Sequence, residues 1–134
     1  MNKVRVLAIQ CLLVMFLQCG PSALDQALTL LKQIDAEVVS STETLKGSES
    51  PQQAATALID LKKNMMQIGA QLKSLEEQYT ELSEQHAKSY LLVQRHQIVL
   101  NLAELNKAAE AARLKYRSNP EFENAVRQFS QGMK

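Results

Sequence analysis

The sequence predicts an all-α protein, because composition, helix boundary signals and apolar spacing agree on this fold class. The chain of 134 residues has four glycines, three prolines, no tryptophan and 4% aromatic residues. Its common residues include Ala, Leu, Gln, Glu and Lys, which are strong helix formers. Apolar residues recur at helical spacing along most of the chain after residue 22. At this length we expect one domain at most.

A first helix is expected over residues 22–46. Asp25 follows Ser22 by three residues, which is the spacing of a capping box, and Gly47 can end the helix in the left-handed conformation. The segment "GSESP" (47–51) then forms a short linker. A seven-residue apolar repeat runs along this helix and contains Leu24, Leu28, Leu31, Val38, Thr42 and Leu45.

A second helix begins with Ser50 as its cap and Pro51 at its first position. No proline follows until Pro120, so residues 51–117 read as one helix of about 67 residues, or about 100 Å. Its first half carries the 4-3 apolar spacing of a coiled coil. This seam comprises Ala54, Leu58, Leu61, Met65, Ile68, Leu72, Leu75, Tyr79, Leu82 and His86.

The apolar repeat changes phase after His86. A stutter in a continuous helix explains the change, and so does a turn near residues 86–89. The segment "EQHAKS" (84–89) has no Gly, Pro, Asn or Asp, so the continuous helix is favoured. The expected fold is then a long helical hairpin, an antiparallel coiled coil, with a short helix at 120–131 capped by Ser118 or Asn119. The alternative is a compact bundle of three to four helices.

The stretch "YLLVQRHQIVLNL" (90–102) is apolar on more faces than an isolated helix can bury. An exposed apolar patch of this kind normally contacts another chain. We therefore expect self-association or a partner helix around residues 79–105. The expected interface residues are Tyr79, Leu82, Tyr90, Leu91, Leu92, Ile98, Val99 and Leu102.

No catalytic residues, cofactor or metal site are expected. His86 and His96 have no acidic or cysteine partner at ligand spacing, and His86 is interpreted as a polar residue that fixes register in the seam. The acidic residues near residue 80 are typical of a solvated helix face, because a slender hairpin has no cleft for acid–base chemistry. These residues are Glu76, Glu77, Glu81 and Glu84.

One basic cluster stands out, formed by Arg113, Lys115 and Arg117 in "RLKYR". It could contact lipid headgroups, a phosphate-bearing partner or a cell-wall polymer, or its cations could stabilise the negative end of the long helix. The formal net charge of +1 gives no electrostatic indication of nucleic-acid binding.

The N-terminal segment has the organisation of a secretory signal peptide. Lys3 and Arg5 precede an apolar run over residues 6–17, after which the chain becomes polar. The run is short for a transmembrane helix, which needs about 20 apolar residues. The alternatives are an uncleaved membrane anchor and a core helix of a cytosolic protein.

The run closes on "FLQC" (16–19), followed by Gly20, and this ending resembles the signal of bacterial lipoproteins, with Gln18 where a small residue is usual. The resemblance implies that residues 1–18 are removed and that Cys19 is acylated. Residues 19–134 would then form a helical domain anchored in the bacterial cell envelope, in the periplasm or outside the cell. At about 0.8 kcal/mol per buried CH₂, several acyl chains would hold the domain on a membrane permanently.

The sequence as a whole favours a lipid-anchored, non-catalytic interaction, adaptor or assembly module that acts through coiled-coil contacts. One alternative is a periplasmic holdase or carrier, in which an apolar groove at 79–105 receives hydrophobic cargo. Another is a cytosolic or secretion-associated coiled-coil subunit in which residues 4–19 belong to the core.

Overall fold

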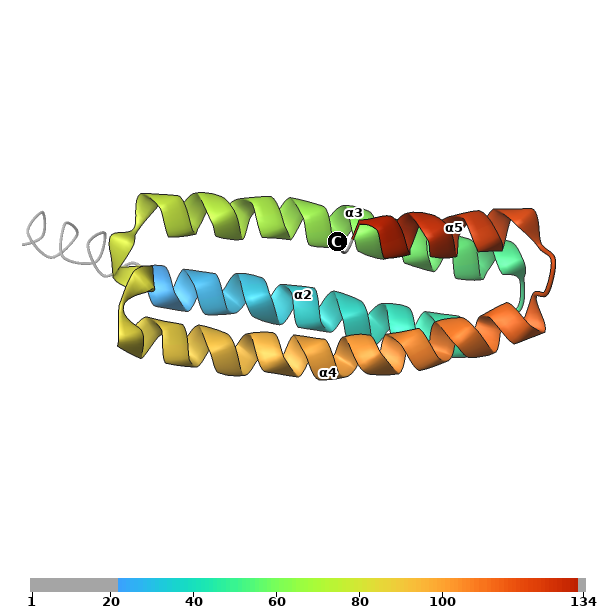
Figure 1. Ribbon diagram of the computed structural model, residues 1–134, viewed down its shortest axis with the longest axis horizontal. Helices are drawn as coiled ribbons and strands as arrows, with labels where there is room; N and C mark the ends of the chain where they lie inside the picture. Colours follow the sequence, from blue (N-terminus) through green and yellow to red (C-terminus); the bar gives the residue numbers. More distant parts are fainter. Residues whose placement is uncertain (1–21, 133–134) are drawn as a thin grey trace, which may run out of the picture.

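The computed structural model describes residues 22–132, and within this range the chain is all-helical, as predicted (Figure 1). Four α-helices and one 3₁₀ turn follow each other without a strand in this part of the chain. They are α2 (Ala23–Lys46), α3 (Pro51–Gln78), η1 (Thr80–Ser83), α4 (Gln85–Lys115) and α5 (Pro120–Gln131). The N-terminal segment and Cys19 lie outside the described residues.

Side-chain caps fix the starts of three helices. Ser22 Oγ accepts a hydrogen bond from the Asp25 amide at 3.1 Å, and Ser50 Oγ accepts one from the Gln53 amide at 3.1 Å. Asn119 Oδ1 accepts from the Phe122 amide at 3.0 Å, so Asn119, and not Ser118, caps the last helix. Each cap satisfies an amide that has no partner within its helix.

The favoured continuous helix over residues 51–117 is wrong. The chain leaves helical geometry at Tyr79 (φ −120°, ψ 100°), forms η1, and is extended again at Glu84 (φ −68°, ψ 148°). Leu82 is buried in this corner. The reversal returns α4 along α2 and so buries apolar surface that a continuous helix would expose. The free energy gained by this burial outweighs the weak turn propensity of a segment without Gly or Pro. The break lies at 79–84, before the position 86–89 considered for a turn.

The helix α2 is the centre of the bundle, because both α3 and α4 pack along its length. Figure 1 shows α3 and α4 on either side of α2, with α5 lying along α3. The helix α5 covers the first half of α3, where Lys62 Nζ donates to the Gln128 carbonyl at 2.7 Å. The most buried apolar side chains come from all four α-helices: Ala27, Leu31, Val38, Leu45, Ala54, Ala55, Leu58, Leu61, Leu91, Leu105, Phe122 and Ala125.

The compact bundle, considered as the alternative to the hairpin, is therefore the arrangement of residues 22–132. The coiled-coil seam of α3 is used, since Ala54, Leu58, Leu61 and Leu72 are buried against the rest of the bundle. The seam does not continue along one helix to His86 as predicted, because α3 ends eight residues earlier, at Gln78. His86 lies on α4 and is exposed, and its ring contacts the Tyr90 ring edge-on, with the two ring centroids 4.9 Å apart. It does not fix register in the seam.

Replacing Phe122 by Ala should lower the free energy of unfolding by about 3–5 kcal/mol, because it removes a fully buried aromatic ring and leaves a cavity. Urea denaturation followed by circular dichroism measures the change. Met66→Ala is the control, since Met66 is exposed, and it should change stability by about 0.5 kcal/mol or less. Equal effects of the two substitutions would contradict the docking of α5 on α3.

Candidate functional site

The helix α4 is apolar on two opposite faces. Its inner face packs on α2 and buries Leu91, Ile98 and Leu105. Its other face points into solvent, where Leu92 is 68% exposed, Val93 72%, Val99 60% and Leu100 50%. An ordinary surface helix has one apolar stripe and one polar face, so the second stripe is not explained by the packing of this bundle.

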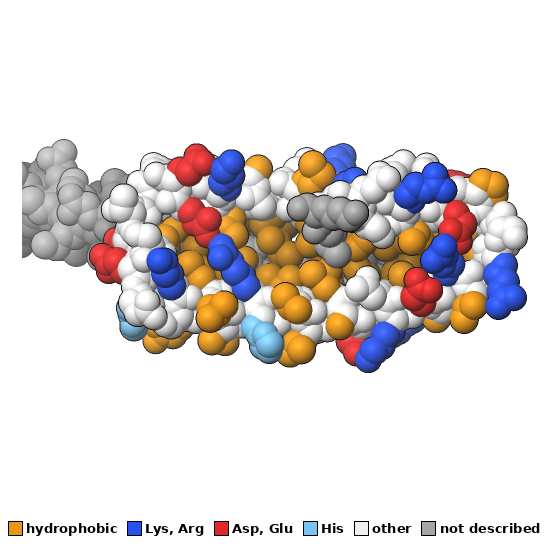
Figure 2. All heavy atoms as spheres, viewed as in Figure 1, with side chains coloured by type: hydrophobic (Ala, Val, Ile, Leu, Met, Phe, Trp, Pro, Cys, Tyr) orange, Lys and Arg blue, Asp and Glu red, His pale blue; other side chains and the backbone are white. Residues whose placement is uncertain are grey.

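We call this second stripe the outer α4 face, formed by Leu92, Val93, His96, Val99 and Leu100. The four apolar residues stand three or four positions from His96, so all five lie on one side of the helix across about two turns. Figure 2 shows apolar side chains along the edge of the molecule that α4 forms. An exposed row of apolar side chains of this kind on a helical bundle indicates an interaction site.

The structure divides the eight expected interface residues into three groups. Tyr90, Leu92 and Val99 are exposed and remain available to a partner. A second group, Leu82, Leu91 and Ile98, belongs to the core and not to a surface, because the break at 79–84 folds α4 onto α2. Tyr79 and Leu102 are partly buried against that core.

Three members of the outer α4 face were missed by the sequence-based interpretation: Val93, His96 and Leu100. A signal for them is present, because they continue the 3-4 spacing of Leu92 and Val99 on a separate stripe from Leu91 and Ile98. Separating the two stripes requires knowing where α4 begins and which side faces α2.

The basic cluster is mostly engaged within the bundle. Arg113 Nε donates to Glu123 Oε1 at 3.0 Å, and this hydrogen bond, with the charges of Glu123 and Glu110, raises the pKa of Arg113. Lys115 Nζ donates to the Ser48 carbonyl at 2.6 Å. Arg117 is exposed. Two of the three cations therefore hold the end of α4 against α5 and the α2–α3 linker, which leaves a small basic surface.

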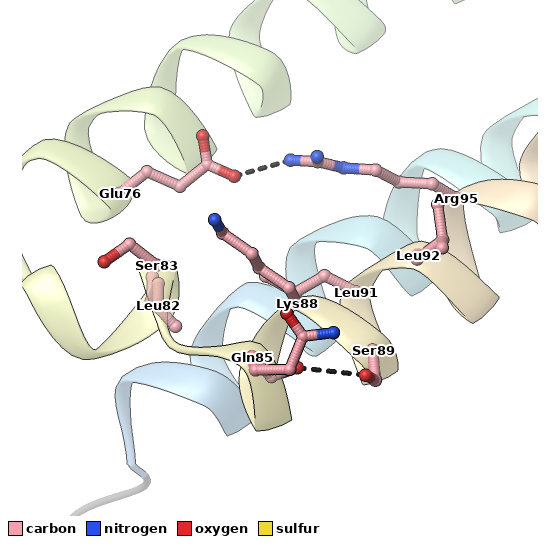
Figure 3. A pocket seen from close by; sticks show the side chains of 9 residues that line it. All are labelled: Glu76, Leu82, Ser83, Gln85, Lys88, Ser89, Leu91, Leu92 and Arg95. Atoms are coloured by element: carbon pink, nitrogen blue, oxygen red, sulfur yellow. Dashed lines mark hydrogen bonds and ion pairs between the residues drawn. The ribbon is translucent and has the colours of Figure 1, made fainter.

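A groove of about 570 Å³ lies between the end of α3 and the start of α4. Figure 3 shows Glu76 and Arg95 pointing toward one another across it, joined by an ion pair, with the Lys88 side chain between the helices. A second cavity, of about 680 Å³, is lined largely by polar side chains of α2 and α3. A site for a small hydrophobic ligand encloses most of the ligand, whereas both cavities are open grooves with a mostly apolar inner surface and polar side chains at their borders.

The acidic residues near the break have the geometry of a solvated face. Glu76, Glu77, Glu81 and Glu84 are all exposed, Glu76 pairs with Arg95, and Glu77 lies 3.9 Å from Lys73 Nζ. Acid–base catalysis requires carboxyl groups whose pKa values are separated by burial or by close charges in a closed site. This cluster lacks such an environment.

Two further features limit what the described residues can do. Residues 22–132 contain no group of three or more His, Cys, Asp or Glu side chains that could hold a metal ion, and no helix in this range is long and apolar enough to cross a membrane.

No protein-family model, no curated protein and no solved structure matches the chain. Its function must be inferred from the geometry and chemistry of its own residues.

Replacing Tyr116 by Phe should lower the free energy of unfolding by about 0.5–1.5 kcal/mol, the typical net contribution of one hydrogen bond. The Tyr116 hydroxyl donates to the Ser48 carbonyl at 2.8 Å and also lies 3.0 Å from Ser48 Oγ, which keeps its own bond to the Leu45 carbonyl in the variant. The Phe variant keeps the edge-on ring contact with Phe122. Lys115 still satisfies the same carbonyl. Urea denaturation measures the loss, and a loss above about 3 kcal/mol would contradict this division of roles.

Proposed function

We propose that the chain is a membrane-tethered, non-catalytic helical module that binds a partner helix through the outer α4 face. The observation that carries the proposal is the row of large apolar side chains on the side of α4 opposite the core. The inner face of the same helix already supplies the packing that holds α4 in the bundle. The outer α4 face is therefore free for contact with another chain.

The apolar area of this face is enough to matter for association. Burying an exposed Val or Leu side chain completely contributes about 1.5–3 kcal/mol. Four such residues, each half or more exposed, give a gain comparable to the estimated 4–15 kcal/mol cost of lost translational and rotational freedom. Fewer exposed apolar residues would be ordinary for a protein surface and would not support binding.

The shape of the surface favours a helix as the bound element. The outer α4 face lies along one continuous helix, with Leu92 at its edge also lining the groove between α3 and α4. Side chains at 3-4 spacing interlock with the same spacing on another helix. A small hydrophobic cargo would need an enclosed apolar site, and the two larger cavities are open grooves with polar side chains at their borders. The geometry thus supports an adaptor or assembly module over a carrier.

The proposed tether is acylated Cys19. It precedes Ser22, the cap of α2, by three residues, so the bundle would be held within about 10 Å of the lipid attachment. Confinement of the module to a membrane surface raises the effective concentration at which its exposed faces meet. A moderate helix–helix affinity is then sufficient for assembly in the cell envelope.

A photoreactive benzoylphenylalanine in place of Val99, in cells expressing the full-length chain, should give adducts of discrete mass on illumination, because a bound helix would lie in contact with it. The matched control is the same residue in place of Met66, an apolar residue of α3 with similar exposure (64%). Denaturing gel electrophoresis detects the adducts. Equal labelling from both positions, or none from position 99, would contradict the proposed surface.

Intact-mass analysis of membrane-extracted protein tests the tether. We expect a mass that corresponds to residues 19–134 plus diacylglycerol and further acyl groups. Cys19→Ser should abolish the added lipid mass and release folded protein from the membrane fraction, since the sulfur that carries the lipid is removed. A full-length mass without lipid in the wild-type chain would contradict the tether, although not the surface on α4.

A further inference from the structure

We propose that the partner helix is α4 of a second copy of this chain, packed antiparallel about a twofold axis that passes beside His96. This inference rests on the proposed function and names its partner. It is carried by a symmetry in the outer α4 face itself. Leucines stand four residues before and after His96, at Leu92 and Leu100, and valines stand three residues before and after it, at Val93 and Val99.

This symmetry fits a twofold-related antiparallel helix pair, because such a pair then brings like apolar side chains to the same level. In such a pair, a residue n positions before the axis lies opposite the residue n positions after it in the other copy. Leu92 would then lie at the level of Leu100 of the second copy, and Val93 at the level of Val99. An isologous interface uses the same patch on both subunits, so the patch must be complementary to itself.

The ends of the stripe fit the same arrangement. Ser89 stands seven positions before His96 and Ala103 seven positions after it. Both residues are small and exposed, which permits close approach of the two helices. The overlap would extend from Gln85 to Lys107 in each copy, or about 34 Å of helix. Two imidazoles would meet at the centre, where a polar residue in an apolar seam fixes the register.

Charge favours the antiparallel over the parallel arrangement. At about 100° per residue, Lys107 and Glu110 lie on the same side of α4 as His96, about 20° and 40° from it. A parallel pair in register would place each of these charges against its own copy, which is unfavourable. The antiparallel pair instead places Lys107 opposite the uncharged Gln85. The Lys107–Glu104 ion pair (2.7 Å) would then lie near His86 of the second copy.

The rest of the bundle leaves room for this contact. Figure 1 shows α4 along one edge of the molecule, with the other helices on its opposite side. The twofold axis is perpendicular to the helices, so with this axis along the membrane normal both α2 caps lie at the same height. Two lipid tethers could then enter the same membrane, with both bundles lying flat on it.

Cysteine cross-linking tests the pairing and its direction. Two full-length variants, Ser89→Cys and Ala103→Cys, are purified in mild detergent, mixed and oxidised. We expect links between position 89 of one copy and position 103 of the other, found only in the mixture. Mass spectrometry distinguishes them, because trypsin places the two positions in the different peptides 89–95 and 96–107 and separates them from links made by native Cys11 and Cys19.

A matched pair of surface variants tests the affinity. Leu92→Glu should raise the dimer dissociation constant at least about tenfold in sedimentation equilibrium, since it places a carboxylate in the apolar contact of both copies. Met66→Glu introduces the same charge at an exposed apolar residue of α3, away from the outer α4 face, and should leave the dissociation constant unchanged. Circular dichroism melting of both variants confirms that each retains the bundle.

Three results would overturn the inference. Predominant 89–89 and 103–103 links would show a parallel pair. A monomer at high concentration, together with discrete photo-adducts from position 99 to a different protein, would refute self-pairing while the proposed function stands. A monomer with no adducts, or with lipid adducts alone, would refute both.

Discussion

The fold of residues 22–132 depends on the burial of α2 between α3 and α4. A single helix of 24 residues supplies the apolar residues to which both longer helices dock. The corner at 79–84 makes this possible, since it reverses the chain and returns α4 along α2. The caps, the Ser48–Tyr116 contact and the ion pair between Arg113 and Glu123 then hold the ends of helices whose positions are already set by this burial.

The same constraint gives α4 its two distinct faces. Once α4 docks on α2, its inner residues are covered and the opposite side must face outward. Nothing in residues 22–132 covers Leu92, Val93, Val99 or Leu100, which remain half or more exposed. Exposed apolar side chains lower the solubility of a protein and do not stabilise its fold. We therefore attribute their presence here to contact with another chain. The mirrored spacing about His96 extends this reasoning from a partner helix to a second copy.

Local chemistry predicted much of the fold. The helices over 22–46 and 120–131 and the caps at Ser22 and Ser50 follow from short-range rules that hold in the structure. The first helix also ends at Gly47 as predicted, but Gly47 has φ −91° and ψ 4°, so the predicted left-handed conformation is wrong. The corner at 79–84 could not be found in this way, because its residues are not typical turn formers. It exists because burying Leu82, Leu91 and Ile98 stabilises a compact bundle, and this gain depends on residues distant in sequence.

The candidate surface was predicted only in part for the same reason. The sequence indicates that residues 90–102 are too apolar for one helix face. It cannot assign Leu91 and Leu92 to core or surface, because that assignment depends on how α4 is rotated against α2. In the structure these two adjacent residues lie on different sides of α4, with Leu91 buried and Leu92 exposed. Once the outer residues are distinguished from the inner ones, His96 lies at the centre of the outer stripe.

The most direct measurement of the central claim is the concentration dependence of thermal unfolding of the full-length chain. If the outer α4 face pairs with a second copy, association stabilises the folded chain by mass action. The melting temperature should then rise with protein concentration, and Leu92→Glu should remove this dependence while Met66→Glu preserves it. A melting temperature of the wild-type chain that stays independent of protein concentration, up to the highest concentrations that can be measured, would contradict the account.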